Sequence, residues 1–577
     1  MLVQALAQYA DTYLAADLQD AAWEEKPVPY LIEIGEDGSF LSVVPRMISV
    51  RPQPLRMPRS PVNRNSGLHP LLAADDIKYV LGAGAWTKPN ERQNHTERFE
   101  AFVALVAKAA LETGDSALEA CERFYSRHAE VERARAAMVE AKPGSLVALS
   151  VKGPLVERDA VQQCWREHYR AAYEQRVEAG GAVGECLISG KVGPIAPTHE
   201  PIKRTTSLGG QQRGVSLMSF DKEAFRSYGW DKNQNSPVSP DRAMAYVLAL
   251  NDLLRTDKGR RRDIAGIGFI FWLKKPAAFD PFNILDQADE SQVRAALSLD
   301  SGADPDPDDR NLFYLAGLSG NGGRLRVRYW VTDSLRHVKG NLHEWFEGLR
   351  VGGFGDALGP VRFWQLLRAV DRDGEPPANR VVALLRRAIE GRAQPLGDQV
   401  LGAALRPLRH AGDATPARLG LVRLCVNDII QVRQEGERPM QEDLDVDQRN
   451  PAYVCGRLLA VYESLQFAAF RGESQPNVNV TDRYYSLASA NPAVAFPRID
   501  DLGKKHLHKL RRKSQGAASA IEQRIQELCG VLGFKFPGVL DLDQQGRFAL
   551  GYYHQKVQSI AQAKARKEQN AREEEED

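Results

Sequence analysis

The sequence predicts a multidomain protein whose N-terminal and middle regions are mixed α/β (α+β) and whose C-terminal region is an all-α helical bundle. The chain has 577 residues, enough for about three or four domains that each bury a core. Strand patterns are concentrated before residue 350, and from about residue 355 onward the pattern is helical with short Gly and Pro breaks. We therefore expect an N-terminal mixed domain (1–183), a strand-rich middle domain (184–350), a helical connecting region (351–439) and a C-terminal bundle (440–577).

The N-terminal region begins with a predicted β-hairpin. Two apolar runs, 30–34 and 40–44, flank the dipeptide Asp37-Gly38, which is typical of a tight turn between antiparallel strands. Apolar residues then recur at helical spacing. We expect helices at 97–111, 116–128 and 154–177, and one further strand at 146–151.

The middle region carries most of the strand patterns. We expect strands at 186–189, 215–220, 264–273, 313–318 and 325–331. A helix is predicted to start at Ser239-Pro240, because Ser is a good N-cap and Pro suits the first helical position. The acidic, Pro-interrupted stretch 299–309 is typical of a disordered surface loop.

The C-terminal region is predicted to close as a helical bundle. Asn450-Pro451 should start a helix whose apolar face carries Leu458, Val461 and Leu465. A second helix is predicted from apolar residues at steps of three and four, namely Leu507, Leu510, Ala517, Ile521, Ile525 and Leu528. Helices that each carry one apolar stripe and are joined by short connections usually pack together.

Composition narrows the class of protein. The net charge is +1, so affinity for nucleic acid must come from local basic patches. Six cysteines with no CxxC pair argue against a zinc site or a disulfide framework. The longest apolar run, 264–273, is too short to span a bilayer, and no signal peptide is visible. We expect a cytoplasmic protein with no membrane partner.

The first basic patch lies in a window, 38–74, that contains no acidic residue. It holds five arginines: Arg46, Arg51, Arg56, Arg59 and Arg64. Prolines keep the segment extended, and its end mixes arginine with asparagine and serine. Arg and Asn side chains can enter a minor groove and sense its acceptors and width. The alternative is an Arg-rich surface loop that wraps a neighbouring domain.

The second patch is the Gly-rich loop 203–214. Its candidate DNA-binding residues are Lys203, Arg204, Gln211, Gln212 and Arg213. Such a loop could enter a groove or wedge a base step and so begin strand separation, or it could be a hairpin tip that stays mobile in solvent. The alternating strand 325–331 adds a weaker candidate, because Arg324, Arg326 and Arg328 share one face. That face could meet guide RNA or an adjacent subunit, but the pattern favours a plain exposed face.

The third patch is the run 504–513. Its six cations are Lys504, Lys505, Lys509, Arg511, Arg512 and Lys513. Leu507 and Leu510 hold the inward stripe, so most of the cations should project outward. A run of one sign this dense repels itself without a polyanion, which favours contact with a nucleic-acid backbone over a plain solvated face.

No catalytic, metal or cofactor site is predicted. The glycines at 266–268 lack the third glycine of a dinucleotide loop, and His343 has no second histidine at metalloprotease spacing. We therefore expect a protein that is not an enzyme and holds no cofactor. A nuclease built from acids brought together by folding stays an alternative, as does a purely structural bridge in a ribonucleoprotein.

Several segments carry a family resemblance. The stretch 184–254 contains GECLISGKVGPIAPTHEPIKR and SFDKEAFRSYGWDKNQNSPVSPDRA, and further matching segments occur along the chain. They are LVQAL (2–6), LLAADDIKYVLG (71–82), FYLAGLSGNGGRLRVRYWVTDSL (313–335), NPAYVCGRLLAVYESLQ (450–466) and GRFALGYYHQ (546–555). Together these segments resemble the large subunit of the type I-C CRISPR surveillance complex, Cascade, over nearly the whole chain.

The resemblance implies a function and a set of partners. It implies a non-catalytic subunit that recognises the protospacer-adjacent motif in double-stranded DNA, helps open the duplex, holds the displaced strand and supports recruitment of a separate helicase-nuclease. The implied partners are guide RNA with its backbone and 5′-end capping subunits, target DNA, and a small subunit encoded by the same gene. On this basis we place motif recognition at Arg59, Asn63, Arg64, Asn65 and Ser66, with Lys78 on the flanking phosphate, and the displaced strand on 504–513.

The resemblance also implies that the small subunit arises by internal translation. Met440 directly precedes the C-terminal helical region and is one of only seven methionines. The preceding Glu435-Gly436-Glu437 can be encoded by a purine run that pairs with ribosomal RNA, two codons before the start. We therefore predict a second product of residues 440–577. The alternatives are that Met440 is an ordinary residue or that a Val codon supplies the start.

Overall fold

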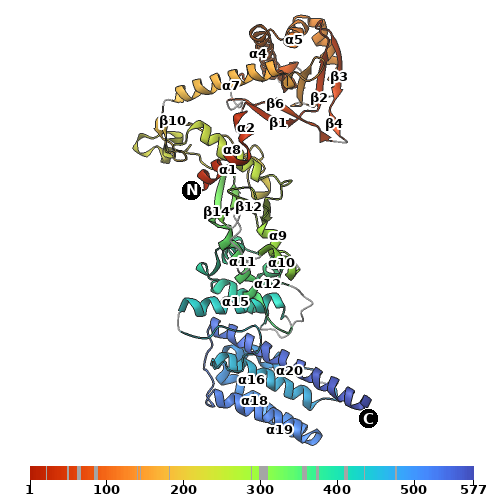
Figure 1. The fold of residues 1–577 in the computed structure, drawn as a ribbon, viewed down its shortest axis with the longest axis vertical. Coiled ribbons are helices and arrows are strands. Elements are labelled where there is room, and N and C mark those ends of the chain that lie inside the picture. Colours follow the sequence, from red (N-terminus) through yellow and green to blue (C-terminus); the bar gives the residue numbers. More distant parts are fainter. Residues whose placement is uncertain are drawn as a thin grey trace. The chain divides into compact units, whose positions relative to one another are not determined.

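Figure 1 shows the fold in the computed structural model of the chain. The chain divides into two compact units. The first comprises Met1–Ile202 with Ser216–Asp252, and the second comprises Lys203–Val215 with Leu253–Asp577. The structure describes the whole chain except residues 21, 49–50, 62–66, 83–88, 140, 143, 181, 288, 298–309, 354–359, 372–375, 409–413, 434–435, 475–476 and 577. The predicted boundaries at 183, 350 and 439 do not coincide with this division, which places parts of the predicted middle domain in both units, and they stay a prediction.

The first unit is a mixed α/β structure around a small sheet. Its elements are α1 (Leu2–Tyr13), α2 (Ala15–Gln19), β1 (Trp23–Pro27), β2 (Tyr30–Ile34), β3 (Phe40–Pro45), β4 (Met47–Ile48), β5 (Arg51–Pro52), β6 (Pro54–Pro58), β7 (Ala74–Asp76), α3 (Ile77–Val80), α4 (Pro89–Thr113), α5 (Ser116–Ser126), α6 (His128–Ala137), β8 (Leu146–Ser150), η1 (Leu155–Glu157), α7 (Asp159–Gly180), β9 (Val183–Glu185), β10 (Val192–Pro194), η3 (Glu223–Gly229), η4 (Lys232–Asn235) and α8 (Pro240–Leu253). The main sheet has the order β3-β2-β8-β7, and its central pair β2–β8 is parallel.

The core of the first unit lies between this sheet and the helices that pack on it. Ile32 and Val147 come from the sheet, and Phe102, Phe124 and Trp165 come from α4, α5 and α7; all five are almost fully buried in one cluster. The predicted hairpin is confirmed, because β2 pairs antiparallel with β3. A separate two-stranded ribbon, β1–β6, runs antiparallel in the segment that precedes the predicted motif-recognition residues.

The second unit contains a four-stranded antiparallel sheet followed by helices. Its elements are η2 (Thr206–Leu208), β11 (Arg261–Ile264), β12 (Ile267–Leu273), α9 (Pro281–Leu285), α10 (Glu290–Leu297), β13 (Leu312–Asn321), β14 (Arg324–Ser334), α11 (Leu335–Leu349), α12 (Phe363–Val370), α13 (Ala378–Glu390), η7 (Gly391–Ala393), α14 (Asp398–Leu408), α15 (Pro416–Arg433), α16 (Pro451–Ala469), α17 (Val480–Ala490), α18 (Pro492–Lys513), α19 (Gln515–Val531) and α20 (Leu542–Glu576). The strand order is β11-β12-β13-β14. The predicted fold class is thus confirmed, since the strands lie in the N-terminal and middle regions and helices form the C-terminal one.

One continuous hydrophobic cluster joins this sheet to the C-terminal helices. Phe271 and Leu315 contribute from the sheet, and Tyr453 and Phe548 contribute from α16 and α20. The α16 and α20 backbones touch, because a Cβ added at Gly456 would lie 2.0 Å from the Phe548 carbonyl oxygen. None of the helices in the described part of the chain combines the length and the apolar character needed to cross a membrane.

Four predicted elements differ from the structure. The strands expected at 186–189 and 215–220 are absent, because 186–189 forms the turn between β9 and β10 and 215–220 is irregular. The strand expected at 264–273 is split by a turn at Ala265, whose φ is +51°. The helix expected to run from Leu507 to Leu528 is two helices, because Ser514 ends α18 and caps α19. The predicted disordered loop 299–309 lies outside the described residues.

Candidate nucleic-acid interface

The N-terminal basic segment is anchored on both sides of its central part. At the end of the β1–β6 ribbon the backbone N–H of Arg59 donates to the carbonyl of Ala22 at 2.7 Å. Further on, the N–H of Leu71 donates to the buried carboxylate of Asp75 at 2.8 Å. Arg59 and Lys78 are both partly buried. The backbone N–H of Lys78 donates to Asp76 Oδ1 at 2.9 Å, and this hydrogen bond caps the start of α3. The other predicted motif-recognition residues, Asn63, Arg64, Asn65 and Ser66, lie outside the described residues.

Arg56 of this segment has an ionic partner in the folded chain. Arg56 forms an ion pair with Asp20, and Arg166 reaches the same carboxylate at 2.8 Å. Burial alone would raise the pKa of Asp20, but the hydrogen bonds and positive charges of Arg166 and Arg56 outweigh it and lower the pKa. Arg56 also lies over the Trp23 ring, 5.9 Å from its centroid. Asp20 therefore links Arg56 of β6 to Arg166 of α7, and the two arginines share its single negative charge.

The Gly-rich loop 203–214 is docked on the sheet of the second unit. Leu208 is buried beside Gly268, and Gly210 forms a β-bridge with Gly322. The contact requires glycine, because a Cβ added at Gly320 would lie 2.3 Å from the Gly210 nitrogen. This docking argues against a hairpin tip that moves freely in solvent.

The buried side chain of Arg261 fixes the start of the same loop. It donates to the carbonyl of Arg204 at 2.9 Å and to Ser207 Oγ at 2.6 Å, and it pairs with Asp263 at 2.6 Å. The predicted residues Lys203, Arg204, Gln211, Gln212 and Arg213 are all exposed.

The structure brings this loop together with the weaker strand candidate. Gln211 lies next to Gly323, immediately before β14, where Arg324 and Arg326 are exposed. Arg328 is also exposed and donates to Ser319 Oγ at 2.8 Å. We name Lys203, Arg204, Arg213, Arg324 and Arg326 the sheet-end surface. It is a basic surface on a rigid support, which suits contact with a phosphate backbone.

Most of the cations in the run 504–513 have acidic partners within the chain. Lys504 pairs with Asp500 at 2.8 Å, and Arg511 pairs with Glu522 of α19. Lys509 and Lys513 both reach Glu473 at 2.7 Å. Their hydrogen bonds lower the pKa of the Glu473 carboxyl to about 2. The expectation of a self-repelling run was wrong, because Asp500 lies one helical turn before Lys504 on α18, and Glu473 and Glu522 come from outside this helix.

The remaining cations form a narrower stripe on α18. Among the residues that the structure describes, Arg498, Lys505 and Arg512 are exposed and make no ion pair. They are seven residues apart and so share one helix face, which His508 joins. We name Arg498, Lys505, His508 and Arg512 the α18 stripe. The sequence analysis missed Arg498, which lies seven residues before Lys505, and His508, which lies three residues after it, although both spacings place a side chain on the same helix face.

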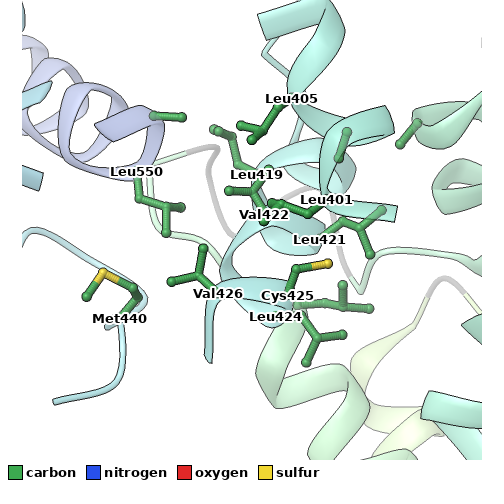
Figure 2. Close-up of a cluster of buried hydrophobic side chains, with 14 of the residues drawn as sticks. Leu401, Leu405, Leu419, Leu421, Val422, Leu424, Cys425, Val426, Met440 and Leu550 are labelled. Carbon is green, nitrogen blue, oxygen red and sulfur yellow. The ribbon is translucent and has the colours of Figure 1, made fainter. Parts of the chain in front are cut away.

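Met440, the predicted internal start, is built into the core of the full chain. Figure 2 shows it among Val426, Leu550 and other apolar side chains, and its side chain is almost fully buried. Its N–H donates to Asn427 Oδ1 at 2.7 Å, and its carbonyl accepts from Asn427 and Arg423, each at 3.0 Å. Both α15 residues precede Met440 in the chain. A product that starts at Met440 therefore lacks the helix that holds its first residue.

The described side chains form no cluster of three or more His, Cys, Asp or Glu residues that could hold a metal ion.

Comparison with known proteins adds one finding. The sequence model of the family described as CRISPR-associated protein (Cas_Csd1) matches residues 5–560, which is nearly the whole chain. No curated protein sequence matches the chain.

Proposed function

Because the chain belongs to the Cas_Csd1 family of CRISPR-associated proteins, we propose that it is the large subunit of a type I-C Cascade complex. In this role it is not an enzyme. It recognises the protospacer-adjacent motif in target DNA, helps open the duplex and holds the displaced strand. Guide RNA supplies sequence specificity by base pairing, as in other RNA-guided systems.

The observation that carries the DNA-holding role is the α18 stripe. Its cations are exposed and unpaired in the described structure, while the neighbouring cations are neutralised by acids of the same chain. A single strand needs a basic track that follows its backbone rather than base readout. Seven residues of helix rise about 10 Å, so Lys505 and Arg512 can serve two different phosphates of one strand.

We assign motif recognition to the N-terminal segment and strand opening to the sheet-end surface. Arg59 and Lys78 flank the segment that carries Asn63, Arg64 and Asn65, and both of its ends are tied to the fold. The loop 203–214 is supported by Arg261 and Gly320, so its exposed Gln211 and Gln212 have a firm base from which to press on a base step.

The remaining partners follow from the same assignment. The chain docks on the guide beside the subunit that caps its 5′ end, and it supports recruitment of a separate helicase-nuclease. The small subunit is the internal product of residues 440–577. Its absence from purified complex after Met440 is changed to a codon that cannot initiate would support this origin.

The test is binding of reconstituted complex, prepared with and without this chain, to target duplexes that carry or lack the motif. A motif preference that requires the chain supports the proposal. The same preference with and without the chain would make it a structural bridge. Metal-dependent DNA cleavage by the isolated chain would make it a nuclease.

A further inference from the structure

Two aromatic side chains of the first unit stand in solvent on one irregular segment. Tyr228 is 95% exposed and Trp230 is 49% exposed. They lie at the end of η3, two residues apart, with ring centroids separated by 6.4 Å and ring planes inclined by 53°. Leaving two large rings in water costs hydrophobic free energy, so their exposure needs an explanation.

The backbone that presents Tyr228 is strained. Its φ is +66°, in the left-handed region that a tyrosine rarely adopts. The surrounding chain holds it there: Asn235 Nδ2 donates to the carbonyls of Phe225 at 2.9 Å and Lys232 at 3.1 Å. Asn233 is buried, and Phe220 packs edge-to-face on Phe225 at 5.3 Å. The two rings are thus displayed by a supported base, and such strained residues cluster at functional sites.

The chemistry around the rings distinguishes between possible ligands. Between Asp221 and Asn235 the other side chains are charged, amide or hydroxyl groups and the buried-side Phe225, and the largest aliphatic one is Ala224. The centre of a protein interface is depleted of charge, whereas sites for single-stranded nucleic acid combine aromatic rings with cations and amides. In the described structure Lys222 and Lys232 are exposed and make no ion pair.

We propose that Tyr228 and Trp230 form a base-stacking site for single-stranded nucleic acid. The rings stack on successive bases, and Lys222 and Lys232 lie within the same short segment to meet the backbone. Asp221 and Glu223 balance much of this positive charge, so the affinity comes from stacking and depends little on salt. The residues of this site are different from those of the α18 stripe and the sheet-end surface. Binding at the two rings does not depend on whether the chain recognises the protospacer-adjacent motif.

Two sources could supply the strand, namely displaced DNA and an unpaired part of the guide RNA. The probes are therefore DNA and RNA oligonucleotides of one sequence, single-stranded, with 5-iodouracil at defined positions. The full chain is compared with Tyr228→Asn, Trp230→Ala and, as a matched control, Leu111→Ala, which removes an exposed apolar side chain from α4 in the same unit. Asn tolerates the left-handed backbone, so Tyr228→Asn removes the ring without adding strain.

We expect photocrosslinks at Tyr228 or Trp230 and a loss of affinity of at least about fivefold for each ring variant, with no change for the control. The salt dependence of binding should be the same in the ring variants and the unchanged chain. A preference for the DNA probe assigns the displaced strand, and a preference for the RNA probe assigns the guide. Unchanged affinity, or crosslinks only elsewhere, would overturn the proposal. So would ring variants that bind both probes normally but fail to assemble with the other subunits, because the rings would then be a protein-docking site. A loss of motif preference with the ring site intact would count only against the proposed function.

Discussion

Replacing Lys505 and Arg512 together by alanine should weaken the hold of the complex on the displaced strand. Both side chains are exposed on one face of α18, and neither has an ion-pair partner in the described structure. Each phosphate contact on a single strand contributes about −0.7 to the slope of log affinity against log salt. Loss of two contacts should flatten that slope by about 1.4. With 1 M salt as the reference, this change of slope weakens binding at about 0.15 M salt by about fourteenfold.

The matched control is the double substitution of Lys504 and Lys509. It removes the same formal charge from the same helix, but these lysines are already paired with Asp500 and Glu473. We expect a clearly smaller loss of affinity and little change of slope. Lys504, Lys505 and Arg512 are exposed, whereas Lys509 is partly buried and lies over the Phe470 ring, 3.5 Å from its centroid. Thermal melting of both variants should therefore accompany the binding measurements.

The assay is equilibrium binding of reconstituted complex to a pre-opened target, at several salt concentrations, with the displaced strand present or absent. The two variants should differ only when the displaced strand is present. Equal losses in both variants would mean that the helix acts through its overall charge. No loss in the Lys505 and Arg512 variant would show that the α18 stripe does not bind the strand.

Three further predictions follow from other parts of the fold. Met440→Leu, encoded by a codon that cannot initiate, should remove the short product and lower the free energy of unfolding of the full chain by less than about 1.5 kcal/mol, whereas Met440→Ala should lower it by about 2–5 kcal/mol. Gels of purified complex check the short product, and thermal melts check the stability. Burial lowers the pKa of His554 to about 4, so between about pH 6.5 and pH 4 the unfolded chain binds a proton that the folded chain does not, and the free energy of unfolding falls by about 2 kcal/mol by pH 5. In urea unfolding at pH 7.5 and pH 5, His554→Gln should reduce this loss of stability, and an identical loss in the variant would contradict the prediction. Gly320→Ala should push the loop 203–214 off the sheet and make Arg204 and Arg213 faster sites of tryptic cleavage, and an unchanged cleavage rate would show that the loop does not depend on this contact.

Elements with strong local signals could be predicted from the sequence. The β2–β3 hairpin follows from Asp37-Gly38 between two apolar runs, and α8 and α16 start at the predicted Pro240 and Pro451. Failures occurred where local and tertiary effects compete. Ala265 and Gly266 turn the chain with φ values of +51° and +71°, and Gly266 is a turn signal that the apolar run around it concealed.

The candidate site was predictable in composition but not in pairing. The run 504–513 is visibly basic, yet Glu473 and Glu522, which pair with part of it, lie outside α18 and meet it only in the folded bundle. Tyr228 and Trp230 are a similar case, because aromatic residues are more often buried and only the fold reveals their exposure. Pattern analysis therefore locates charge, and the tertiary structure decides which charges stay available.

The most direct test of the central claim is the motif preference of complex in which Arg59, Asn63, Arg64 and Asn65 are changed to alanine. Reconstituted complex with the unchanged chain should bind the motif-bearing duplex more tightly than the duplex that lacks the motif. The account predicts that the variant binds both duplexes equally weakly. If the variant keeps its preference, the N-terminal segment is scaffolding and the loop 203–214 becomes the leading candidate for motif recognition.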